Sequence, residues 1–114
     1  MSFWRKEVID FALNRETSAS VEEQLRWIDR EPANPVPYYQ LAQLLRIQLK
    51  QDDALALLLQ AISLEPRFGD AHVALAEIYA VRMDYPAAWR HARAAAEAGN
   101  CAGVELLTRH GVPE

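Results

Sequence analysis

The chain has 114 residues, of which 51% are hydrophobic and 25% are charged, with a formal net charge of −4. This length is enough for one domain whose core needs no disulfide or metal. The 12 Lys and Arg residues are outnumbered by 16 Asp and Glu and form no basic cluster, which argues against nucleic-acid binding. Glycine is scarce, and Ala, Leu, Glu, Gln and Arg are frequent, so the composition predicts an all-α fold.

The composition also bears on the cell compartment. Cys101 is the only cysteine, so an intramolecular disulfide is impossible. The cysteine content is therefore compatible with a reducing compartment. The first ten residues carry charges where a signal peptide needs an apolar run. The longest uncharged apolar stretch, residues 54–64, is far shorter than the about 20 residues of a membrane span. We therefore expect a cytoplasmic protein that does not contact a membrane.

The first two predicted helices occupy the N-terminal third. The first is marked by apolar residues at helical spacing: Phe3, Trp4, Val8, Phe11 and Ala12. The polar segment 14–20 ends it. Ser20 and Glu23 form a capping box that begins the second helix, and Pro32 ends that helix near Glu31.

Three further helices follow in the middle of the chain. Asn34 caps the third, with Pro35 at its first position, where the missing N–H costs nothing. The fourth is rich in leucine and begins at Asp52 or Asp53. The fifth is expected over about residues 70–82.

The last two helices follow the same logic. Asp84 caps the sixth and Gly99 ends it, and Asn100 caps a shorter seventh that runs to about His110. A row of hairpins leaves its last apolar face exposed, so a terminal cap is needed. The seventh helix carries three apolar residues that can cover this face, namely Val104, Leu106 and Leu107.

A period of 34 residues runs through these helices. The dipeptide Glu-Pro occurs at 31–32 and again at 65–66. The same period aligns similar residues in shared columns: Trp4 with Tyr38 and His72, Phe11 with Leu45 and Tyr79, Ala54 with Ala88, Ala61 with Ala95, and Leu41-Ala42 with Leu75-Ala76. A fixed period of this size is typical of a repeat architecture.

These columns resemble the pattern of the tetratricopeptide repeat (TPR) family. The units are a degenerate repeat at 1–34, two clearer repeats at 35–68 and 69–102, and a capping helix and tail at 103–114. The third unit departs from the family pattern at His72, Ala92 and Asn100. The resemblance implies one right-handed solenoid of helical hairpins with about seven helices.

The resemblance also implies a function. TPR arrays bind peptides in a concave groove lined by the first helix of each repeat. We therefore expect a non-catalytic protein–protein interaction module that binds a peptide or protein segment. The residues expected to line its groove are Arg5, Ile9, Tyr39, Gln43, Arg46, Ile47, Asp70, Val73, Glu77 and Val81.

One TPR subfamily can be tested directly. Its members hold the acidic tail of heat-shock chaperones with a clamp of Lys and Asn residues. The matching positions here are Arg5, Ile9, Gln40, Asp70 and Ala74. Only Arg5 has a suitable charge, and Asp70 repels a carboxylate, so this clamp is absent.

The residues that could support catalysis are scattered. The three histidines, His72, His91 and His110, fall on three different predicted helices without metal-ligand spacing. Cys101 has no base beside it in the sequence. We expect no enzyme activity, no metal and no cofactor.

A second hypothesis makes self-association the function. The sequence has more apolar surface than one hairpin needs, supplied by Trp27, Trp89 and the segment 55–59. Such a surplus is typical of a homodimer interface. On this hypothesis, replacing either tryptophan by alanine changes the oligomeric state. Replacing Tyr39 and Arg46 instead tests the groove.

Overall fold

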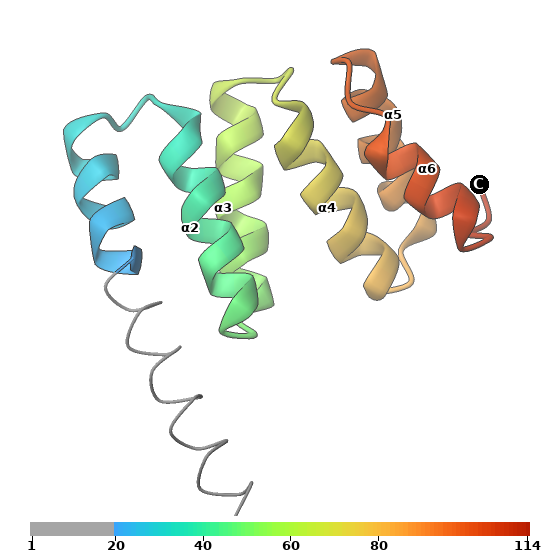
Figure 1. The fold of residues 1–114 in the computed structure, drawn as a ribbon, viewed down its shortest axis with the longest axis horizontal. Helices are drawn as coiled ribbons and strands as arrows, with labels where there is room; N and C mark the ends of the chain where they lie inside the picture. Colours follow the sequence, from blue (N-terminus) through green and yellow to red (C-terminus); the bar gives the residue numbers. More distant parts are fainter. Residues whose placement is uncertain (1–19) are drawn as a thin grey trace, which may run out of the picture.

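The structure is a computed structural model that describes residues 20–114 (Figure 1). A helix over residues 20–30 is followed by five more: α2 (Pro35–Ile47), α3 (Gln51–Leu64), α4 (Gly69–Val81), α5 (Tyr85–Glu97) and α6 (Ala102–Arg109). The part of the chain that the structure describes contains no strand, so the all-α prediction is confirmed. The predicted first helix and most of the polar segment after it lie outside the described residues.

Consecutive helices run antiparallel, so α2, α4 and α6 point in one direction and α3 and α5 in the other (Figure 1). Each helix from α2 to α6 packs against the next along the chain, and α4 also packs against α6. Side chains join α2 to α4 directly, through Arg46 and Glu77. The helices α2, α4 and α6 therefore form one row.

The helix starts confirm the predicted caps Asn34 and Asp84, whereas the cap of α6 is Cys101 rather than the predicted Asn100, which lies one residue earlier. The Asn34 side chain accepts a hydrogen bond from the Val36 amide at 3.0 Å, and the Asp84 side chain accepts one from Ala87 at 3.3 Å. The helix α3 begins slightly earlier than expected, at Gln51. Asp52 and Asp53 lie in the first turn and not at the cap. A carboxylate in the first turn is stabilised by the helix dipole.

The 34-residue period reappears in the turns that end α2 and α4. Leu49 and Met83 both have left-handed backbones, with φ of 63° and 64°. In each turn the next residue donates a backbone hydrogen bond to the carbonyl five residues earlier, from Lys50 to Leu45 and from Asp84 to Tyr79, at 2.9 Å. These are equivalent Schellman-type endings at positions where glycine is usual.

We expect Leu49→Gly and Met83→Gly each to raise the free energy of unfolding by about 0.5–1 kcal/mol. Glycine removes the strain of a side chain at positive φ, and both side chains are mostly exposed, so little burial is lost. Urea unfolding followed by circular dichroism measures the change. The control is Gly99→Ala, which makes the reverse change at φ 97° in open space and should destabilise. Destabilisation by either glycine would contradict this account.

Small residues allow the helices to approach closely. The central cluster, between α2, α3 and α4, is built from alanines and a few larger side chains: Ala42, Ala54, Leu58, Ala61, Ala71, Ala74, Leu75 and Ile78. A second cluster joins α4, α5 and α6: Ala76, Ala88, Trp89, Ala92 and Leu107. Leu107 is 2% exposed, and Val104 and Leu106 are half-buried beside it. The last helix therefore covers apolar surface of α4 and α5.

The second cluster corrects one expectation about self-association. Trp89 is only 4% exposed, and its indole N–H donates to the Val112 carbonyl at 3.2 Å. The Arg93 guanidinium lies 5.4 Å from the ring centre. Trp89 belongs to the core of the chain itself because α6 and the C-terminal tail cover it, so its surface is not surplus.

Polar contacts tie residues about 30 positions apart. They are Arg46–Glu77 at 2.9 Å, Arg82–Asp52 at 2.6 Å, Arg67 to the Glu97 carbonyl at 3.0 Å, and Asn100–Asp70 at 2.8 Å. Their separations are 30 or 31 residues. The first three contacts join the predicted repeats 35–68 and 69–102, and the fourth joins the beginning and the end of the repeat 69–102. Among residues 20–114, no helix has the length and apolar character that crossing a membrane requires.

Candidate functional site: the surface of α2, α4 and α6

A chain of polar side chains connects α2 to α4. The Gln43 amide donates to the Tyr39 hydroxyl at 3.3 Å and accepts from the Arg46 guanidinium at 3.1 Å. Arg46 then donates to the Glu77 carboxylate at 2.9 Å. These four residues are half-buried, and helical spacing places Tyr39, Gln43 and Arg46 along one side of α2. These three hydrogen bonds bring together four of the ten predicted groove residues.

Tyr39 lies where this chain meets a second aromatic ring. The Tyr39 and Phe68 ring centres are 5.2 Å apart with a tilt of 43°. Burial raises the pKa of the Tyr39 phenol above its ordinary value, and the carboxylates of Asp70 and Glu77 raise it further. Tyr39 is therefore a neutral hydroxyl at pH 7, in an environment where carboxylates outnumber the one nearby arginine.

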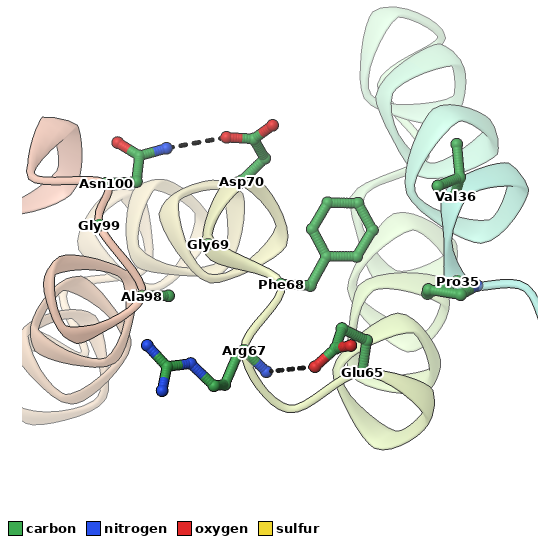
Figure 2. A pocket seen from close by; sticks show the side chains of 10 residues that line it. All are labelled: Pro35, Val36, Glu65, Arg67, Phe68, Gly69, Asp70, Ala98, Gly99 and Asn100. Carbon is green, nitrogen blue, oxygen red and sulfur yellow. Dashed lines mark hydrogen bonds between the residues drawn. The ribbon is translucent and has the colours of Figure 1, made fainter.

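A cavity of about 530 Å³, the amino-end cavity, lies where α2, α4 and α6 begin. Its lining comes from the starts of these helices and the loops before them: Pro35, Val36, Glu65, Arg67, Phe68, Gly69, Asp70, Ala98, Gly99 and Asn100. Figure 2 shows the Phe68 ring between α4 and Val36, with Asp70 bonded to Asn100 on one side. The Arg67 side chain extends instead toward Ala98.

A second cavity, the carboxyl-end cavity, lies where the same three helices end. Its volume is about 550 Å³, and its lining is mostly apolar: Arg46, Glu77, Ala80, Val81, Tyr85, Leu106, Leu107, His110 and Val112. A smaller cavity of about 380 Å³ beside it is lined by Gln43, Arg46, Ile47 and Gln51. Ile47 and Val81 are 69% and 74% exposed. Exposed aliphatic side chains beside an apolar cavity are typical of a binding surface.

The remaining predicted residues are divided. Asp70 lines the amino-end cavity, and Ile47 and Val81 line cavities at the other end. Val73 is half-buried and faces Gly103 of α6, so it is a packing residue. Arg5 and Ile9 lie outside the described residues.

Sequence reasoning missed several lining residues. Phe68 precedes α4 in a loop, outside the helical spacing that predicts the groove residues. Leu106 and His110 belong to the helix interpreted only as a cap. Leu106 and His110 could have been predicted from the common direction of α2, α4 and α6. A last helix that runs parallel to α4 and packs beside it extends the surface that α2 and α4 form.

The structure also pairs two histidines that the sequence placed on separate helices. The Nδ1 atoms of His72 and His91 are 3.0 Å apart, and His72 Nε2 lies 2.8 Å from the Pro66 carbonyl. A carbonyl only accepts, so His72 donates from Nε2, and neutral His72 accepts from His91 at Nδ1. Tyr79 stacks on His91 with an angle of 6° between the rings. Both histidines are buried and form a satisfied internal pair.

We expect this pair to make the fold sensitive to acid. Burial, with smaller contributions from repulsion by His72 and Arg90, lowers the pKa of His91 from 6.5 to about 4. Between pH 6.5 and about 4 the unfolded chain binds more protons at His91 than the folded chain does. The contribution of neutral His91 to the free energy of unfolding is therefore fully present above pH 6.5 and is lost as the pH falls toward 4. Between pH 7 and 5 the expected loss is about 1–2 kcal/mol.

Urea unfolding at pH 7 and pH 5, for the wild type and His91→Gln, isolates this contribution. The substitution should reduce the pH dependence, whereas His110→Gln, at an exposed position, should not. Equal pH dependence in the wild type and His91→Gln would show that the pair does not titrate as described.

Side chains that could hold a metal ion are dispersed over the described part of the chain. Within residues 20–114, no group of three or more His, Cys, Asp or Glu side chains is arranged to hold a metal ion. Cys101 is an exposed free thiol.

Comparisons with protein-family models and with curated proteins yield no match to this chain.

Proposed function

We propose that the chain is a TPR-like right-handed solenoid of helical hairpins that works as a non-catalytic protein–protein interaction module. It binds a peptide or protein segment in a groove along the row of α2, α4 and α6. Support for the repeat comes from the equivalent turns at Leu49 and Met83, 34 residues apart. Support also comes from the polar contacts that join residues 30 or 31 positions apart.

One observation carries the proposed binding function. The polar chain from Tyr39 to Glu77 runs between two cavities, and the carboxyl-end cavity is lined mainly by apolar side chains from three helices. Hydrogen-bonding groups beside an apolar recess, together with an aromatic and an arginine, form the composition in which binding energy concentrates.

Self-association remains the second candidate, on a different surface. With Trp89 in the core, the large apolar residues among 20–114 that are exposed and line none of the described cavities are Leu25, Leu49, Leu59 and Met83, at 48%, 83%, 40% and 74% exposure. Leu59 lies on α3 and lines none of the described cavities. A change at Leu59 therefore separates the two functions.

Affinity capture from a lysate of the source cell, read by mass spectrometry, compares the wild type with Val81→Asp and Leu59→Asp. Val81 is 74% exposed, so aspartate leaves the fold intact while placing a charge in the apolar lining. We expect a partner that Leu59→Asp retains and Val81→Asp loses. Equal capture by all three chains, or loss only with Leu59→Asp together with a change in molar mass, would favour assembly.

A further inference from the structure

The two ends of the α2/α4/α6 surface differ in chemistry. At the amino end, the rings of Tyr39 and Phe68 lie 5.2 Å apart beside Asp70, an exposed carboxylate. At the carboxyl end, Ala80, Val81, Leu106 and Val112 line an apolar recess. We call these the cation subsite (Tyr39, Phe68 and Asp70) and the apolar subsite (Ala80, Val81, Leu106 and Val112).

Charge at the amino end favours a basic group. Asp70 and Glu77 both raise the pKa of Tyr39, against a single lowering charge from Arg46. Arg46 is already paired with Glu77, and the amino-end cavity is lined by two carboxylates, Glu65 and Asp70, against the one guanidinium of Arg67, so negative charge is in excess there. The nearby Arg67 guanidinium is directed to the Glu97 carbonyl and away from Phe68. Both the Phe68 ring, which packs against Tyr39, and the Asp70 carboxylate line the amino-end cavity, so they provide cation–π and ionic contacts for a Lys or Arg side chain.

The middle of the surface favours an extended backbone. Gln43, Arg46 and the Tyr39 hydroxyl provide donors and acceptors between the two subsites. An extended peptide has free backbone N–H and C=O groups to pair with them, whereas a helix has satisfied its own. A docked helix would need an apolar stripe against this polar stretch.

We propose that the partner is an extended segment with a Lys or Arg in the cation subsite and an aliphatic residue in the apolar subsite. The distance between the subsites sets the spacing. Asp70 and Val81 are eleven residues apart on α4, which is about 16 Å of helix. An extended chain covers that distance in about five residues. This inference rests on the proposed peptide-binding function and specifies its ligand.

Selection of phage-displayed random twelve-residue peptides on the immobilised full chain tests the proposal. The wild type is compared with Asp70→Lys and with Asp53→Lys. Asp53 is a matched control because it is also an exposed acid in the first turn of a helix, so both changes alter the net charge and the helix dipole alike. Asp53 lines none of the described cavities.

We expect the wild type and Asp53→Lys to enrich peptides with a basic residue about five positions from an aliphatic one. The best peptide should bind Asp70→Lys about tenfold more weakly or worse, and Asp53→Lys within about twofold of the wild type. An uncharged or acidic consensus, a spacing near eleven, or a basic preference that survives in Asp70→Lys would overturn this inference while leaving peptide binding intact. Failure of the wild type to enrich any peptide would overturn both proposals.

Discussion

Replacing Trp89 with alanine is expected to lower the free energy of unfolding by about 3–5 kcal/mol and to leave the oligomeric state unchanged. The side chain is 4% exposed and packs against Ala76, Ala92 and Leu107. Its removal leaves a cavity that the surrounding alanines are too small to fill. The substitution also deprives the Val112 carbonyl of its donor and so loosens the tail over α6.

Urea unfolding and light scattering after size exclusion measure the two quantities. Trp27→Ala is the matched control, since Trp27 is only half-buried and its indole N–H donates to Glu31, the residue that directly follows its own helix. We expect a smaller loss of stability there. A Trp89→Ala chain of nearly normal stability but altered molar mass would show that this indole serves an interface between copies.

Replacing Gly103 with valine is expected to lower the free energy of unfolding by about 1–3 kcal/mol and to abolish peptide binding. A Cβ at this position lies 3.3 Å from both Cα and Cβ of Ala92, and 3.7 Å from a methyl group of Val73. Backbone cannot yield as a flexible side chain does, so the added methyl groups push α6 away from α4 and α5. Leu106 and His110 leave the carboxyl-end cavity with it.

A graded series distinguishes this mechanism from simple unfolding. Gly103→Ala adds only the close Cβ and gains helix propensity, so it should remain near wild-type stability and keep most binding. Circular dichroism and affinity for a selected peptide are measured on both variants. If Gly103→Val binds as tightly as the wild type, α6 does not form part of the site.

Helix positions were largely predictable because each depends on local chemistry. Asn34 and Asp84 cap their helices as expected, since a short acceptor before an apolar run has few alternatives. The start of α3 was placed slightly late because Asp52 and Asp53 suit either a cap or a first turn. Such choices differ by small energies that the local sequence does not resolve.

The site was predictable only in part. Tyr39, Gln43, Arg46 and Glu77 follow from helical spacing, and the structure joins them through hydrogen bonds. Phe68 and the pairing of His72 with His91 depend on how loops and neighbouring helices meet, which no spacing within one helix encodes. The prediction for Trp89 was wrong because a large apolar side chain looks the same in sequence whether a later segment covers it or a partner does.

Peptide binding along α2, α4 and α6 is the central claim, and amide chemical shifts test it most directly. A peptide selected on the wild type is titrated into the ¹⁵N-labelled full chain. We predict shifts at Tyr39, Glu77, Val81 and Leu106, with little change at Leu59 on α3 or Arg90 on α5. Shifts centred on α3 and α5 instead would place binding on the other side of the helices and contradict the account.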